Sequence, residues 1–132
     1  MSYEMFVQGF EDGHAAPMPA AAFDVFRSHV DRTRPEHHFW HVRTLDGGEA
    51  DIYADVTTGT VGSFMISRFS AGDPLDLLAE FTTRAGAVIL APGGPAMLTA
   101  EARRQHLPDD FQPDAIVVRN GDDIRQAIEG PP

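Results

Sequence analysis

Two stretches of alternating polar and apolar residues flank a glycine-rich turn, and this feature constrains the fold of the chain more than any other. The stretches are His37–Leu45 and Glu49–Asp55, and Asp46-Gly47-Gly48 joins them. Successive side chains of a β-strand point to opposite faces, so alternation on both sides of a turn predicts a β-hairpin. A three-residue loop with a left-handed glycine would place Val42 opposite Ile52.

The alternation also assigns the hairpin side chains to two faces. The apolar face is expected to belong to the core and carries Trp40, Val42, Ile52 and Ala54. The outer face mixes aromatic and charged residues, with Arg43 opposite Asp51 in this register, and carries Phe39, His41, Arg43, Asp51, Tyr53 and Asp55. Aromatic residues are enriched at the centres of protein interfaces. We therefore predict that the outer face is a partner-binding patch.

The remaining segments predict further strands and helices by the same criteria of periodicity, capping and turn residues. Strands are expected over Glu4–Phe10, Val61–Phe69, Ala87–Ala91 and Ala115–Arg119, and helices over Ala20–Val30, from Asp73 to Gly86, from Thr99 to His106, and after Asn120. Asp73 is the expected N-cap of the second helix. The segment Ala87–Ala91 is uninterrupted apolar, which is typical of a strand covered on both faces.

The order of these elements predicts the fold class. It favours an α+β fold, a mostly antiparallel sheet with a three-strand meander and helices packed on one side. The length of 132 residues is typical of one domain. A single α+β domain over residues 1–132 is therefore expected.

The charge of the chain limits its partners. Twenty acidic residues stand against ten arginines and no lysine, which gives a formal net charge of −10. Such a field repels nucleic acids and anionic membranes and attracts cationic proteins. The arginines are scattered and form no basic stripe. We expect a basic protein as partner, and neither nucleic acid nor membrane.

The composition also predicts a compartment. The chain has no cysteine, which fits a reducing cytoplasm. Its first residues lack the basic start and apolar run of a secretory signal, and no run approaches membrane-spanning length. A soluble cytoplasmic protein is expected.

A search for catalytic and metal-ligating patterns assigns no catalytic, cofactor or metal residue. The serines lie in no Gly-x-Ser-x-Gly elbow, and Gly93-Gly94 lacks the lysine of a phosphate loop. His37 and His41 would lie about 13 Å apart on a strand, too far to share a metal ion. The turn at Glu11–His14 offers oxygen and nitrogen ligands but lacks the spaced acids of a calcium loop, so a solvated turn is expected.

Four segments carry a resemblance to a known group of proteins: Met1–Phe10, Glu49–Tyr53, Leu77–Phe81 and Ala115–Arg119. Together they resemble small uncharacterised α+β proteins of high-GC bacteria, and this resemblance implies no activity. In size and acidity the chain also resembles immunity proteins of bacterial toxin systems, a class that shares a role and no motif.

Three hypotheses about function follow. The leading one is a non-enzymatic acidic binding protein that masks a cationic partner, with toxin immunity as its example. The first alternative is a small-molecule or metal-dependent enzyme whose site is assembled from distant residues such as His14, His41 and His106. The second alternative is a homodimeric structural protein. No cofactor is expected under the leading hypothesis.

Overall fold

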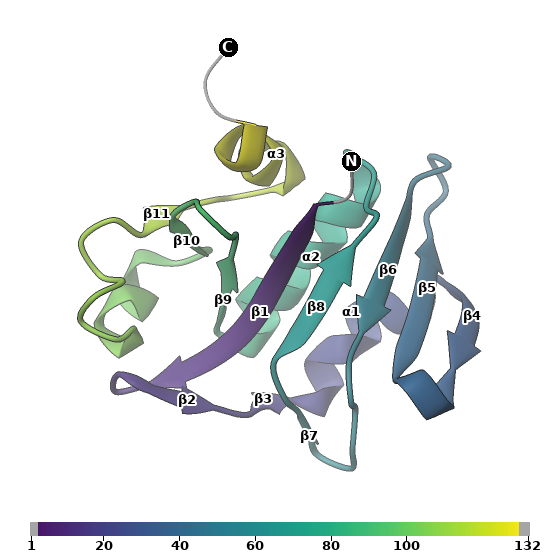
Figure 1. The fold of residues 1–132 in the computed structure, drawn as a ribbon, viewed down its shortest axis with the longest axis horizontal. Coiled ribbons are helices and arrows are strands. Elements are labelled where there is room, and N and C mark those ends of the chain that lie inside the picture. The colour runs from purple at the N-terminus through teal and green to yellow at the C-terminus, as the bar shows by residue number, and fades with distance from the viewer. Residues whose placement is uncertain (1–2, 130–132) are drawn as a thin grey trace.

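A long, mostly antiparallel sheet organises the molecule (Figure 1). The computed structural model describes residues 3–129, so the two ends of the predicted domain, residues 1–2 and 130–132, lie outside the described residues. In spatial order the path of the main sheet is β11 (Ile116–Val117), β10 (Ala96–Leu98), β9 (Ala87–Leu90), β1 (Glu4–Glu11), β8 (Phe64–Ser67), β6 (Glu49–Tyr53), β5 (Phe39–Arg43) and β4 (Val30–Arg34).

The other elements complete the fold. Strand β2 (His14–Ala16) pairs with β1, and β3 (Met18–Pro19) pairs with β7 (Thr60–Val61) in a second small sheet. The helices are α1 (Asp24–Arg27), α2 (Asp73–Ala85) and α3 (Gly121–Glu129), and the 3-10 helices are η1 (Ala20–Phe23), η2 (Pro35–His37) and η3 (Glu101–His106). The pairing of β10 with β11 is parallel, whereas the other strand pairs of the described chain are antiparallel. The predicted α+β class is confirmed, and β5, β6 and β8 form the predicted meander.

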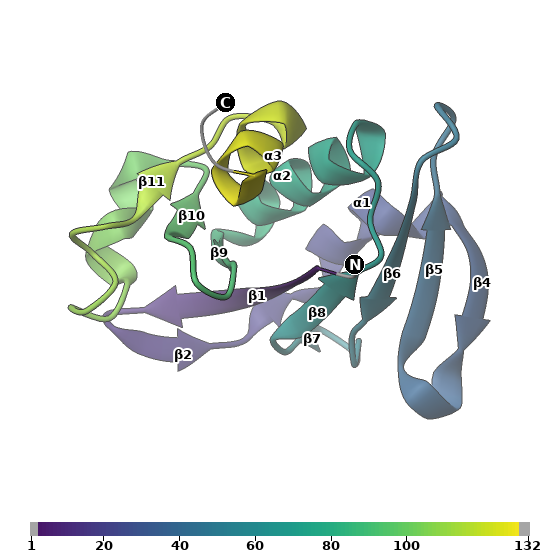
Figure 2. The ribbon, with the colours of Figure 1, turned by 45° about the horizontal axis from the view of Figure 1, so that its top comes forward.

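The main core lies between one face of the sheet and the helices α1, α2 and α3 (Figure 2). Its centre is a cluster of phenylalanines from η1, α1, β8 and α2, all at most 2% exposed: Phe23, Phe26, Phe64 and Phe81. Ring pairs packed edge to face or offset add to the free energy gained from burial alone. This cluster therefore fixes the helices on that face of the sheet.

A smaller apolar cluster covers the opposite face at the β9 and β10 end. It contains Val88, Ala96, Leu98, Leu107 and Ala115. Val88 belongs to this cluster, whereas its neighbour Ile89 belongs to the main core. Strand β9 is thus covered on both faces, as its uninterrupted apolar sequence predicts.

The hairpin of β5 and β6 is confirmed, but the predicted register is wrong by two residues. Val42 pairs with Ala50 and Trp40 with Ile52. The loop Thr44–Gly48 is longer than expected because the Thr44 backbone N–H donates to the Gly48 carbonyl at 2.9 Å. A shift by two preserves the faces of a strand, so Val42 and Ile52 are still buried in the core.

The predicted helix over Ala20–Val30 is also wrong in its second half. The turns of η1 and α1 end at Arg27, and Val30 begins the edge strand β4, which pairs with β5. Strand β5 begins only at Phe39, because Pro35 opens the turn η2 and His38 follows in the left-handed conformation, with φ of 54°. Sheet pairing along β5 outweighs the weak helical pattern beyond Ser28.

Three smaller expectations are corrected where tertiary pairing interrupts a pattern. The stretch Val61–Phe69 is divided between β7 and β8, because Val61 pairs with Met18 whereas Phe64 pairs with Val7. The stretch Ala115–Arg119 contributes only the two residues of β11. The turn before His106 is a 3-10 helix that begins after Ala100 and lacks a side-chain cap.

Helix α2 begins with a cap supplied by the hairpin loop. Gly72, not the predicted Asp73, occupies the N-cap position. The carboxylate of Asp46 accepts hydrogen bonds from the backbone N–H groups of Asp73 at 3.1 Å and of Gly48 at 2.9 Å. These bonds and the Thr44 hydroxyl, which contributes most, lower the pKa of Asp46. The hairpin loop is thereby joined to the helix. Gly86 ends α2 in the left-handed conformation, as predicted.

Candidate functional site

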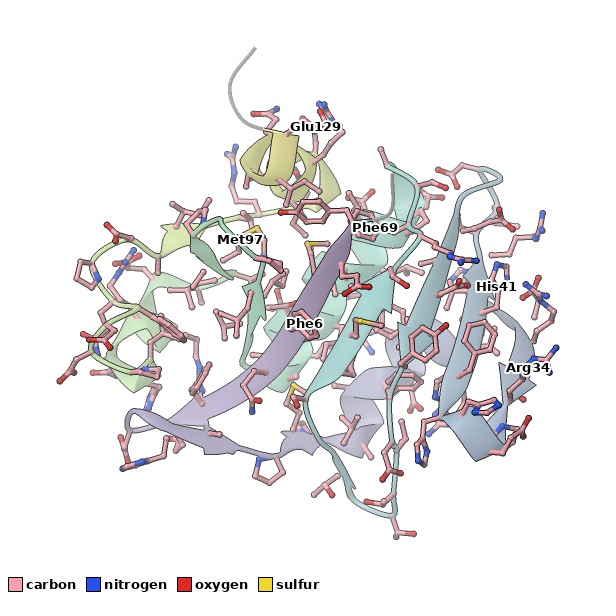
Figure 3. All side chains as sticks on the ribbon, viewed as in Figure 1. Phe6, Arg34, His41, Phe69, Met97 and Glu129 are labelled. Carbon is pink, nitrogen blue, oxygen red and sulfur yellow. The ribbon has the colours of Figure 1, made fainter. Side chains whose placement is uncertain are left out.

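The face of the sheet opposite the helices carries an exposed row of apolar side chains. Tyr53 pairs with Phe39 on one side and with Met65 on the other, and Met65 pairs with Phe6 of β1. We call these four residues the aromatic row. Tyr53 and Phe6 are 39% and 40% exposed, and Figure 3 shows Phe6 in front of β1. Paired residues point to the same face, so the row crosses four strands without interruption.

One end of the aromatic row borders an open hollow. The rings of Phe39 and Tyr53 lie 5.3 Å apart between centroids, with 51° between their planes. Together with Arg34 and His37 they line a hollow of about 430 Å³ at the β4 edge. An open hollow bordered by two rings, with one arginine and one histidine at its other side, suits an aromatic side chain of a partner. This end of the row offers the best anchoring position on the face.

A buried histidine lies beside the aromatic row. The side chain of His41 is 6% exposed, and its Nδ1 donates a hydrogen bond to Asp31 at 2.5 Å. Its Nε2 lies 3.3 Å from Glu49 Oε1. Arg43 joins the same two carboxylates, at 3.4 Å from Asp31 and 2.9 Å from Glu49. This group of four side chains, the His41 cluster, attaches the edge strand β4 to β5 and β6.

The His41 cluster determines the ionisation of Asp31. The hydrogen bond from His41 is the largest influence, and Arg43 adds to it; together they hold the pKa of Asp31 below its ordinary value of 3.8. A carboxyl group whose pKa is lower in the folded state binds protons more readily in the unfolded state. Its contribution to stability is complete above pH 3.8 and is lost as the pH falls through the folded pKa.

We expect the replacement Asp31→Asn to destabilise the protein at pH 7 and to have a smaller effect under acid. The physical reason is that the advantage of the wild-type carboxylate begins to be lost below pH 3.8 and is gone once the pH has fallen through its lowered folded pKa, after which the two side chains differ little. Urea denaturation of both proteins between pH 7 and pH 3 measures the difference. A difference that stays constant over this range would contradict the assignment. Leu45→Ala, in the exposed hairpin loop, is the control that removes no titrating group.

The structure does not bring the six predicted patch residues together on one exposed surface. Phe39 and Tyr53 meet in the aromatic row, whereas His41 and Arg43 belong to the His41 cluster. The prediction of His41 and Asp51 as patch residues meets buried side chains, because β4 and β8 flank the hairpin on its two sides. The sixth residue, Asp55, is exposed, and its carboxylate lies 3.7 Å from His38 Nδ1.

Sequence reasoning missed the part of the row that lies outside the hairpin. Phe6 lies between Met5 and Val7, and all three are apolar, so the sequence does not tell which face of β1 is open. Only the pairing of Phe6 with Met65 places it in the row. Met65 itself lies among apolar neighbours in β8 and carries no signal of its own.

The three histidines of the predicted dispersed enzyme site are not brought together. His41 lies on β5, and strands β6 and β8 separate β5 from β1. His14 lies on β2 beside β1, and His106 ends η3. His106 instead approaches the turn after β1, where its Nδ1 lies 3.3 Å from Glu11.

The comparisons with known proteins add no relative. No protein-family model, no curated protein and no solved structure matches the chain. Neither the resemblance to high-GC bacterial proteins nor the likeness to immunity proteins therefore gains support from them. Among residues 3–129 no helix is both long and apolar enough to span a membrane.

Proposed function

We propose that the protein is a non-enzymatic binding protein that docks a cationic protein on the open face of its sheet. The aromatic row is the observation that carries this proposal. Phe6 and Tyr53 each leave about two fifths of their surface in water, although the helix side of the same strands is fully packed. Contiguous exposed apolar surface on a folded protein is typical of an interaction site.

The charge of the chain supports a cationic partner. At −10 the protein attracts basic surfaces and accelerates their encounter with it. Glu4 and Asp55 are exposed beside the aromatic row. Across the described residues, seven arginines form ion pairs with acids, whereas Arg32 and Arg34 of the edge strand β4 and Arg68 after β8 have no such pair. A partner would accordingly place its basic side near Glu4 and Asp55 and away from these three arginines.

Immunity to a basic toxin is the biological role that we propose for such a protein, in the cytoplasm of a bacterium. Masking a toxin needs affinity and no chemistry, and an acidic, cysteine-free domain with an apolar docking row meets this need. The enzyme alternative has less support because His41 lies far along the sheet from His14 and His106. The homodimer alternative has less support because two chains of charge −10 repel each other.

An affinity experiment at two ionic strengths tests this proposal. The immobilised protein is exposed to native lysate, and bound proteins are identified by mass spectrometry. We expect a basic protein to be retained at about 0.01 M ionic strength and released at about 0.5 M, because salt screens charge attraction. Retention of acidic proteins alone, or of nothing, would contradict the proposal.

A matched variant and a mass measurement make this experiment specific. Phe111 is 38% exposed, nearly as much as Tyr53, but it follows η3 at the other end of the sheet. Phe111→Ala should therefore retain the partner. Light scattering of the purified protein distinguishes a homodimer from a monomer. A dimer that dissociates when Phe6 is replaced by alanine would mean that the aromatic row binds a second copy of the chain and not a cationic partner.

A further inference from the structure

A histidine and two carboxylates meet at the end of the sheet farthest from the His41 cluster. Glu11 ends β1, Asp12 follows it in the turn, and His106 ends η3. One ligand atom from each of the three residues lies within 4.8 Å of the other two. The His106 Nδ1 atom is 3.3 Å from Glu11 Oε1 and 3.5 Å from Asp12 Oδ1.

These separations match the edges of a metal coordination shell. Zinc binds histidine nitrogen and carboxylate oxygen at about 2.0–2.1 Å with tetrahedral geometry, which places neighbouring ligand atoms about 3.3 Å apart. The two distances from His106 Nδ1 agree with this value within about 0.2 Å. The third separation, between the two carboxylate oxygens, is within 4.8 Å, so the exposed side chains of Glu11 and Asp12 would close on an ion between the three atoms.

The chemistry of the three atoms points to the same ligand. Carboxylate oxygens only accept, and His106 Nδ1 has a lone pair in the tautomer that accepts the Asp12 backbone N–H at 3.3 Å; a metal ion would replace this hydrogen bond at the same lone pair. Three electron-pair donors thus converge. Arg103 offsets charge only at the other oxygen of Glu11, where its Nη2 lies 3.6 Å from Oε2. A cation that accepts lone pairs would satisfy all three.

Contacts around the cluster hold its two halves in place. The Gly13 backbone N–H donates to the His106 carbonyl at 2.9 Å, which joins the turn after β1 to the end of η3. Arg103 donates to the Phe10 carbonyl at 3.0 Å, and its Nη2 lies 3.6 Å from Glu11 Oε2. Such outer contacts orient ligands, although the positive charge of Arg103 beside Glu11 reduces the attraction for a cation.

We propose that Glu11, Asp12 and His106 bind a divalent transition metal ion, with zinc as the closest match. One imidazole nitrogen and two carboxylate oxygens suit zinc, whereas magnesium and calcium prefer oxygen ligands alone. Among the described residues no fourth histidine or carboxylate joins this group, so water would take the remaining position of the shell. The aromatic row lies elsewhere on the sheet, so this site does not depend on the proposed docking function.

Calorimetric titration of the tag-free, chelator-treated protein with zinc chloride tests the site. We expect one zinc ion per chain. Glu11→Gln and Asp12→Asn, which keep the shape of each side chain, should each weaken binding about tenfold or more. His106→Ala should abolish it. Failure to bind zinc, or binding that survives these replacements unchanged, would overturn the proposal.

Two controls sharpen the result. His37→Ala removes an exposed histidine from η2 and should leave zinc binding unchanged. Loss of zinc binding in this variant would mean that zinc binds near η2 and not at His106. Magnesium chloride should give no binding at the concentrations that saturate the site with zinc. Magnesium prefers a full set of oxygen ligands, and this site offers two carboxylates and an imidazole nitrogen. Equal binding of magnesium and zinc would overturn the assignment to a transition metal. Circular dichroism spectra of each variant confirm that it is folded.

Discussion

Replacing Phe81 by alanine is expected to lower the free energy of unfolding by about 3–5 kcal/mol. Phe81 is fully buried and lies between three other phenylalanine rings, with centroids at 5.1 Å from Phe64, 5.6 Å from Phe26 and 6.4 Å from Phe23. These residues come from three separate parts of the chain, so the cavity cannot close by a local shift. Native domains are stable by only about 5–15 kcal/mol, so this is a large loss. Urea denaturation at pH 7 measures it.

The matched control uses the same residue type on the other face of the sheet. Phe6→Ala removes a ring that is 40% exposed in the aromatic row, so its truncation should cost well under half as much as that of Phe81. Equal losses for the two variants would mean that the open face is packed as a core. Such a result would remove the basis for docking a partner there.

Truncation of the aromatic row is expected to have the largest effect on partner binding. Tyr53→Ala and Phe39→Ala should each weaken binding of the cationic partner by about 2 kcal/mol or more, roughly a thirtyfold rise in Kd. The reason is that their paired rings border the hollow at the β4 edge, where an anchoring side chain of the partner would be fully desolvated. Surface plasmon resonance with the partner identified in the affinity experiment measures the change.

The rate constants separate the two contributions to binding. Loss of the rings should appear mainly as faster dissociation, whereas Asp55→Asn should slow association and weaken its dependence on salt. Phe111→Ala should change neither. Unchanged affinity in both Tyr53→Ala and Phe39→Ala would exclude the aromatic row as the docking surface, even if a basic partner had been captured.

The hairpin illustrates how much of the candidate site is readable from sequence. Strict alternation assigned Phe39 and Tyr53 to one face and Val42 and Ile52 to the other, and this assignment is confirmed even though the register is shifted. The faces survive because a strand has a side-chain period of two. The shift itself depends on hydrogen bonds within the loop Thr44–Gly48, which alternation does not reveal.

Other elements were unpredictable because their causes lie far away in the chain. Asp46 accepts a hydrogen bond from the backbone of Asp73, so the helix start is capped by a residue of the hairpin loop. The segment after Ser28 leaves its helical pattern because β5 offers a strand to pair with. Burial of His41 follows from the same pairing, since Asp31 of β4 lies against its ring.

The sequence by itself determined the α+β class, the meander, the two faces of the hairpin and the acidic field, because periodicity, turn residues and charge are local or additive properties. Only the tertiary structure decided that Phe6 continues the aromatic row and that His106, 94 residues along the chain, meets Asp12. Contacts between distant segments depend on strand order and register, which are set by packing of the whole molecule, and a single sequence does not display them.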